Sequence, residues 1–188
     1  MPRLLLASAS PRRRELLGLA GVDFEAVATS AEELREGAPA EVVVQNALLK
    51  ARAGLQLRPD AELVLGADTE VSIGGRVLGK AGSEDVAREY LHELSGQTHE
   101  VLGGVAVLGP QREERTALER TRVTFADLAE MEIDAYLASG EWRDRAGAYA
   151  VQGLGASFVT AVEGDLANVI GLPVRALRSL APELFDRL

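Results

Sequence analysis

Short apolar runs alternate with stretches of helical periodicity in the first third of the chain. An apolar run between turn residues is typical of a buried strand, and apolar positions three and four residues apart are typical of a helix. Ser10 and Pro11 are favoured at the start of a helix, and Gly18 and Gly54 follow periodic segments as helix stops. The pattern predicts strands at residues 3–7 and 24–28 and helices at residues 11–18 and 39–53.

A longer apolar run at residues 62–67 indicates a strand covered on both faces. Asp68 and Thr69 follow it, where polar residues of α/β sheets often face a ligand. Gly74-Gly75 then predicts a hairpin. The remaining pattern predicts strands at 101–108, 116–125 and 157–162, and helices at 83–94, 130–139 and, in two pieces around Pro182, 173–188. The predicted class is α/β with a mixed sheet.

The length of 188 residues and the lack of repeats or long linkers favour one domain, residues 1–188. The apolar stretch at residues 4–7 is far shorter than a signal peptide core or a membrane span. We therefore expect a cytoplasmic protein without a membrane partner.

Charge and residue usage narrow the chemistry further. A formal net charge of −9 argues against nucleic acid polymers, because their phosphates need a broad basic face. There is no cysteine and there are only two histidines, so thiolate and paired-histidine metal sites are excluded or improbable. Carboxylates holding a hard cation are the better expectation.

A cluster of hydroxyls and arginines lies where the first predicted helix begins. A helix N-terminus carries partial positive charge, so Arg12 and Arg13 are unfavourable there unless an anion binds. Backbone N–H groups, guanidinium forks and the hydroxyls of Ser8 and Ser10 together predict a polyphosphate site. In the alternative interpretation the arginines extend into water, and the serines serve only as a helix cap and a strand-end hydroxyl.

Asp68 is the second candidate, because Gly66 and Ala67 before it leave room for a metal or a water to approach. It could instead begin a turn. Lys50 and Lys80 could each neutralise phosphate charge, or could be ordinary solvated lysines.

The stretch at residues 147–156 is dense in small residues around one aromatic and one amide. The Gln152 amide offers donors and an acceptor that match the edge of uracil or thymine. A glutamine that satisfies the backbone of its own loop is the alternative.

Motifs in a fixed order give the chain a family resemblance. They are SASPRR at 8–13, LKA at 49–51, GADT at 66–69, LGK at 78–80, LSGQTHEV at 94–101, AGAYAVQG at 146–153 and NVIGLP at 168–173. On these motifs, which cover nearly the whole chain, the sequence resembles the Maf family of nucleoside triphosphate pyrophosphatases.

The resemblance implies a bent mixed β-sheet flanked by helices, with two lobes and a cleft, as in inosine triphosphate pyrophosphatase-like proteins. It also implies a homodimer and hydrolysis between the α and β phosphates. Asp68 matches the family's proton acceptor, and the pyrimidine branch is matched at Arg12, Thr69 and Gln152. The phosphate-binding pattern falls on Ser8, Arg12, Arg13, Lys50 and Lys80.

The expected cofactor is Mg²⁺ or Mn²⁺, held by Glu32 and Asp68. The family often has an Asp-Glu pair where this chain reads Ala31-Glu32, and the neighbouring Glu33 leaves the second carboxylate open between Glu32 and Glu33. Gly103 stands where the family more often has threonine.

The function expected from this resemblance is hydrolysis of dTTP, UTP and modified pyrimidine nucleotides, which would serve house-cleaning of the nucleotide pool, with cell-division arrest as the family's other theme. Two alternatives are a non-catalytic nucleotide sensor that regulates division and a purine-selective pyrophosphatase. Asp68 argues against a sensor, because a carboxylate repels phosphates unless a metal or a proton transfer uses it. Thr69 and Gln152 argue against the purine enzyme.

Overall fold

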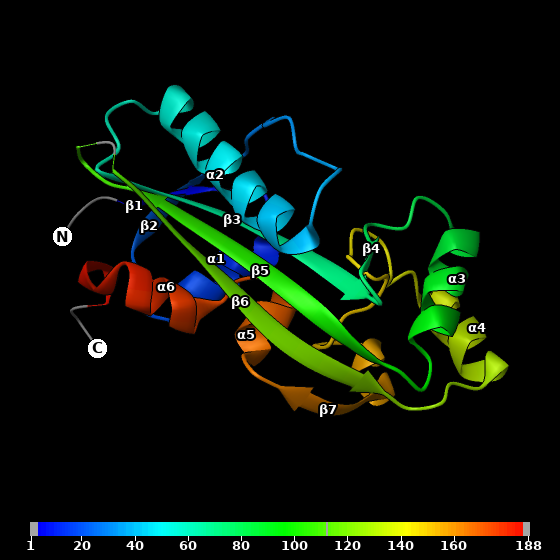
Figure 1. Ribbon diagram of the computed structural model, residues 1–188. Helices are drawn as coiled ribbons and strands as arrows, with labels where there is room; N and C mark the ends of the chain where they lie inside the picture. Colours follow the sequence, from blue (N-terminus) through cyan, green and yellow to red (C-terminus); the bar gives the residue numbers. More distant parts are fainter. Residues whose placement is uncertain (1–3, 112, 186–188) are drawn as a thin grey trace.

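A seven-stranded mixed sheet organises the protein (Figure 1). The computed structural model describes residues 4–111 and 113–185. The strand order is β2-β1-β3-β5-β6-β7, with β4 paired to β3; β1 runs parallel to β2 and β3, and the other pairs are antiparallel. The strands are β1 (Leu4–Ala7), β2 (Phe24–Val27), β3 (Leu63–Ile73), β4 (Arg76–Leu78), β5 (Thr98–Leu108), β6 (Glu114–Phe125) and β7 (Val159–Glu163). The predicted α/β class with a mixed sheet is confirmed.

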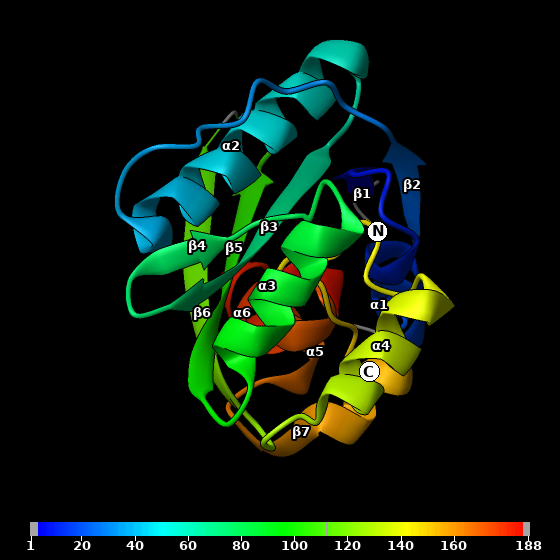
Figure 2. The same cartoon turned by 90° about the vertical axis from the view of Figure 1, so that its right-hand side faces the viewer.

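Helices cover both faces of the sheet and one end of it (Figures 1 and 2). One face carries α2 and the opposite face carries α1, α5 and α6, while α3 and α4 lie beyond the end of the sheet near β4. None of the helices within residues 4–111 and 113–185 has the length and apolar character to cross a membrane. The helices are α1 (Pro11–Leu19), α2 (Pro39–Leu57), α3 (Glu84–Leu94), α4 (Glu130–Ser139), α5 (Leu166–Ile170) and α6 (Val174–Leu180), with 3₁₀ turns at Leu154–Phe158 and Pro182–Leu184.

The hydrophobic core falls into two lobes along the long strands. At the β1 end, apolar side chains of β1, β3 and β5 pack against α2 on one face and against α1 and α6 on the other. At the far end, β5 and β6 pack against α3, α4 and the loop around Trp142 and Tyr149. The two ends are joined by the continuous strands β3, β5 and β6.

Three details of the sequence prediction are wrong for physical reasons. The strand before Asp68 does not end there, because β3 keeps its antiparallel ladder with β5 from Val64 to Ser72. Gly54 does not stop its helix, since α2 continues to Leu57; a Cβ at Gly54 would lie 2.7 Å from the Ala7 Cβ, so the glycine permits close packing on β1. Ser10 makes no side-chain capping hydrogen bond.

Candidate active site

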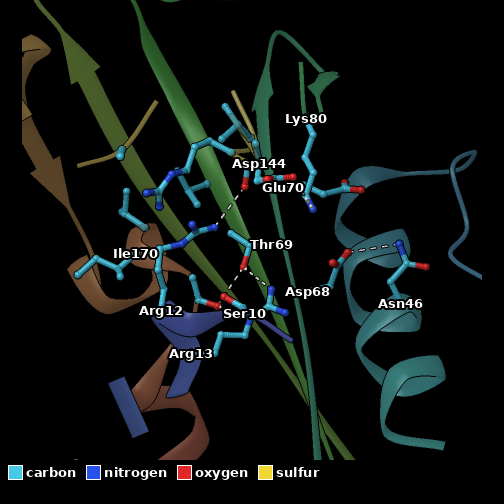
Figure 3. Close-up of a pocket in the computed structure, with 18 of the residues that line it drawn as sticks. Ser10, Arg12, Arg13, Asn46, Asp68, Thr69, Glu70, Lys80, Asp144 and Ile170 are labelled. Atoms are coloured by element: carbon cyan, nitrogen blue, oxygen red, sulfur yellow. Dashed lines mark hydrogen bonds and ion pairs between the residues drawn. The ribbon is translucent and has the colours of Figure 1, made fainter. Parts of the chain in front are cut away.

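A cleft of about 670 Å³ opens between the two lobes, beside the middle of β3 (Figure 3). Its walls come from the start of α1, from α2, from the end of β4, from the loop at residues 144–152 and from the end of α5 with Gly171. Most of the predicted site residues line it: Arg12, Arg13, Lys50, Asp68, Thr69, Lys80 and Gln152. Segments that are far apart in the sequence thus converge on one concave site.

Asp68 lies in the middle of β3 with its carboxylate turned toward α2 (Figure 3). It is only 7% exposed. The Lys50 ammonium approaches Oδ1 at 2.7 Å, and the Asn46 amide donates to Oδ2 at 3.3 Å. Both partners project from α2, so one helix fixes the direction of the carboxylate. Sequence reasoning did not single out Asn46.

Asn46 also holds the loop that brings a second carboxylate to the site. Its side chain accepts from the Leu34 backbone N–H at 2.7 Å and donates to the Leu34 carbonyl at 3.1 Å. Beside that anchor, the Glu33 carboxylate contacts the Lys50 ammonium at 2.9 Å. Glu32 lines a separate outer groove and not the cleft. Of the two carboxylates left open by the sequence, Glu33 therefore lies at the cleft and contacts the Lys50 ammonium together with Asp68, whereas Glu32 does not.

Glu70 is a third carboxyl group in the cleft that sequence reasoning missed. It lies two positions along β3 from Asp68, on the same face of the strand. Burial first, and then the negative charges of Asp68 and Glu33, raise the pKa of Glu70 to about 7, against the opposing effect of Lys50. Its Oε2 atom is buried without a hydrogen-bond partner.

Arg13 ties three parts of the site together. Its guanidinium donates to the Gly171 carbonyl at 2.9 Å, to Ser8 Oγ at 3.3 Å and to Thr69 Oγ1 at 3.3 Å. Thr69 Oγ1 donates in turn to the Gly171 carbonyl at 3.2 Å. Burial lowers the pKa of Arg13, while Asp68 and Glu33 raise it. Ser8 is buried behind Arg13 and does not line the cleft, whereas Ser10 does.

Arg12 and Lys80 are the less constrained cations. Arg12 Nη2 donates to the Asp144 carbonyl at 3.4 Å. Burial first, and then the positive charges of Arg145 and Arg13, lower the pKa of Arg12 to about 10, against the opposing effect of Asp144. Lys80 is exposed, and its ammonium lies 3.9 Å from the Asp144 carboxylate. Both cations can therefore turn toward an anion in the cleft.

The loop that carries Gln152 is held in place by His99 and Glu141. The Tyr149 hydroxyl lies 2.9 Å from His99 Nε2, and the two rings pack edge to face. The Glu141 carboxylate accepts from the Leu154 and Gly155 backbone N–H groups at 2.9 and 3.1 Å. Gln152 itself is exposed at the cleft, so its amide can face a ligand.

The residues at the cleft can support metal-assisted phosphate chemistry. Lys50 lies 2.7 Å from Asp68 and 2.9 Å from Glu33, which shows that these carboxylates are close enough to share one cation. No group of three Asp, Glu, His or Cys side chains among the described residues is arranged to hold a metal by itself. Mg²⁺ commonly needs only one or two carboxylates when substrate phosphates supply further oxygens. The oxygen donors, including the unpartnered Glu70 Oε2, fit such a cation.

Comparisons with known proteins show which proteins the chain resembles. The model of the family described as Maf-like protein matches residues 3–184. A dTTP/UTP pyrophosphatase of Bacillus cereus (strain ATCC 10987 / NRS 248) is 48% identical over 94% of this chain and 87% of its own length. One of Bacillus thuringiensis subsp. konkukian is 48% identical over 94% of this chain and 93% of its own length.

A solved structure shows the same fold at low sequence identity. A HAM1 protein from Coxiella burnetii matches 99% of this chain and all of its own length, with a TM-score of 0.54 and 17% identity. The Ham1 protein of Staphylococcus aureus matches 66% of this chain and 72% of its own, with a TM-score of 0.50 and 16% identity.

Proposed function

Because the chain belongs to the family of Maf-like proteins, we propose that it hydrolyses dTTP and UTP to the nucleoside monophosphate and pyrophosphate. Relatives named dTTP/UTP pyrophosphatase share 48% of its residues over most of their length. The observation that carries the proposal is the position of Asp68. Its carboxylate is fixed by Lys50 and Asn46 in a cleft that Arg12 and Arg13 also line.

In this mechanism Asp68 is the general base. A base must lie within hydrogen-bond reach of the proton that it removes, so the attacking water lies against the Asp68 carboxylate, facing the α phosphorus. The proton passes to Asp68 as the new oxygen–phosphorus bond forms and the bond to the β-phosphate oxygen breaks. Arg12, Arg13 and Lys80 supply N–H donors for the charge that builds on the leaving pyrophosphate.

Metal dependence on Mg²⁺ or Mn²⁺ is part of the proposal. Asp68 and Glu33 would hold the ion together with phosphate oxygens, in the place where the Lys50 ammonium now contacts both carboxylates. A bound divalent cation would supply charge neutralisation for the phosphates and activation of a water. Lys50 would then turn its ammonium to a phosphate, as its predicted role requires.

Selectivity for the pyrimidine nucleobase is assigned to Gln152, Thr69 and Arg12. The Gln152 amide is exposed at the cleft and matches the hydrogen-bonding edge of uracil or thymine. Thr69 would act indirectly, by positioning Arg13 and Gly171, because its hydroxyl already hydrogen-bonds to both. The homodimer, the cytoplasmic location, and the roles in house-cleaning and cell-division arrest remain predictions from the family resemblance.

The test is product analysis on a panel of nucleoside triphosphates, with Mg²⁺, Mn²⁺ or chelator. The wild-type protein is expected to release pyrophosphate fastest from dTTP and UTP, and chelator is expected to stop the release. Asp68→Asn removes the base with little change in shape, and is expected to lower kcat at least about a hundredfold. Asp134→Asn is the control, because Asp134 is 62% exposed and pairs with Arg88 away from the cleft.

Other outcomes separate the alternatives. Binding of nucleotides without hydrolysis in wild-type protein would favour the sensor. Faster hydrolysis of ITP or a guanosine nucleotide than of UTP and dTTP would favour a purine enzyme and would contradict the assignment of Gln152.

A further inference from the structure

Arg145 is a cleft residue without a partner. It lines the cleft from the loop between α4 and β7 and is half-buried, and its side chain makes no hydrogen bond or ion pair with any residue that the structure describes. Its Nε atom is buried with its N–H unsatisfied. Lys50 contacts two carboxylates and Arg13 donates three hydrogen bonds, so Arg145 differs from the cations around it. A buried donor without an acceptor lowers the stability of a protein, and a ligand that accepts its hydrogen bond removes this cost.

The backbone around Arg145 is held in an unusual conformation. Asp144 and Ala148 both have φ of +58°, a region that non-glycine residues rarely adopt, and such strain is common at ligand sites. Between them the chain is pinned to the end of β4. Gly147 donates its N–H to the Leu78 carbonyl at 2.8 Å, and Ala146 forms a β-bridge with Lys80. The loop therefore fixes where the Arg145 side chain leaves the backbone.

The same loop brings a second guanidinium to Arg145. Arg12 donates to the carbonyl of Asp144, the residue directly before Arg145. The positive charge of Arg145 contributes, after burial, to the lowered pKa of Arg12. The carboxylate whose charge opposes this lowering is Asp144, and its side chain is 88% exposed. Two half-buried guanidiniums without a buried counter-charge form a site for an anion.

We propose that Arg145 is a further phosphate-binding residue, which holds with Arg12 the two terminal phosphates that leave as pyrophosphate. The proposal rests on the proposed function and assigns an orientation to the substrate. Asp68 lies on the α2 side of the cleft and marks the α phosphate, whereas Arg12 and the Asp144 carbonyl lie on the opposite side (Figure 3). Guanidinium forks bind phosphate oxygens in pairs, so two arginines suit a diphosphate group.

The test compares the binding of inorganic pyrophosphate and of dTMP by titration calorimetry. Arg145→Gln is expected to weaken pyrophosphate binding roughly ten- to hundredfold, the effect of losing charge-assisted hydrogen bonds. Binding of dTMP is expected to stay within about threefold of wild type, because it lacks the terminal phosphates. Arg145→Lys keeps the charge without the fork and is expected to show an intermediate loss.

Arg143→Gln is the matched control. Arg143 lies two positions away, is exposed and stacks on Trp142 at 4.7 Å, outside the cleft. It is expected to bind both ligands as wild type does. Thermal melting of each variant checks that it is folded; if Arg145→Gln does not fold, Arg145→Lys carries the comparison.

Three results would overturn the assignment: unchanged pyrophosphate affinity in both Arg145 variants, an equal loss for pyrophosphate and dTMP, or no pyrophosphate binding by wild type. Failure of the proposed function looks different. In that case wild-type protein would hydrolyse neither dTTP nor UTP, while pyrophosphate binding would still depend on Arg145.

Discussion

The burial of His99 leads us to expect that the protein loses stability in mild acid. Its ring is 2% exposed, packs edge to face against Phe125 and Tyr149, and has one nitrogen on the Tyr149 hydroxyl; its Nδ1 is buried without a partner. Burial lowers the pKa of His99 from 6.5 to about 4. The unfolded chain therefore takes up a proton as the pH falls below 6.5, while the folded protein resists it until about pH 4.

The size of the effect follows from that difference in pKa. One pKa unit corresponds to about 1.4 kcal/mol, so His99 protonation lowers the free energy of unfolding by about 3 kcal/mol in the limit of low pH. About 2 kcal/mol of this is lost between about pH 7.5 and pH 5. Since Tyr149 belongs to the loop that carries Gln152, the same protonation is expected to loosen the cleft wall.

The assay is urea denaturation at both pH values for wild type, His99→Gln and His92→Gln. His99→Gln is less stable overall, but its unfolding free energy is expected to fall about 2 kcal/mol less than that of wild type on acidification. His92, with a side chain 47% exposed on α3, is the control and keeps the wild-type pH response of His99. Equal pH dependence in wild type and His99→Gln, or an NMR titration of His99 near pH 6.5, would show that burial does not lower the pKa of His99.

Two further predictions concern the strand that carries the site. Burial raises the pKa of Glu70 from 4.5 to about 7, so the folded protein holds a proton there that the unfolded chain has released, and its stability falls as the pH rises through this window. In chelator-treated protein, Glu70→Gln is therefore expected to raise the free energy of unfolding by about 1 kcal/mol at about pH 8, a value that allows for solvent screening. Near pH 4.5 removal of this charge is expected to have little effect. Equal gains at both pH values in denaturation curves would contradict this. Gly66→Ala places a Cβ against the Ala47 carbonyl oxygen of α2, where there is no room for it. The variant is expected to lose about 3 kcal/mol of unfolding free energy and to have a lower kcat, because α2 is displaced. Gly18→Ala, where a Cβ meets nothing within 4 Å, is the control and should be neutral or slightly stabilising; similar losses in both variants would show that close packing of α2 is not the cause.

Where the structure departs from the sequence prediction, the deciding contact is tertiary. A glycine after a periodic segment indicates a helix stop, yet Gly54 is required by the approach of α2 to Ala7, a contact between distant segments. A polar pair after an apolar run resembles a strand end, yet Asp68 and Thr69 stay in β3 because β5 pairs with them on one side. Gly103 is explained in the same way, because a Cβ there would overlap with Asn168 Oδ1.

The candidate site was predictable where chemistry is concentrated in a motif. Arg12, Arg13 and Asp68 carry their signal in neighbouring residues, and the structure places them around one cleft. Asn46, Glu70 and Arg145 are single polar residues whose sequence surroundings are ordinary. Had the strand predicted at residues 62–67 been extended through Glu70, the alternation of side chains along a strand would have placed Glu70 on the same face as Asp68.

The choice between Glu32 and Glu33 depended on an irregular loop without periodicity. Its placement is set by the contact between Asn46 and Leu34, which bridges twelve positions of the sequence. Such a contact leaves no signal in the residues themselves.

The most direct test of the account is the fate of the oxygen from water during one turnover of dTTP. With Asp68 directing water to the α phosphorus, heavy-oxygen water is expected to label dTMP and to leave pyrophosphate unlabelled in mass spectra. Label in pyrophosphate would place the attack on the β phosphorus, and formation of dTDP and orthophosphate would place it on the γ phosphorus. Either result would contradict the proposed site of cleavage and the role assigned to Asp68.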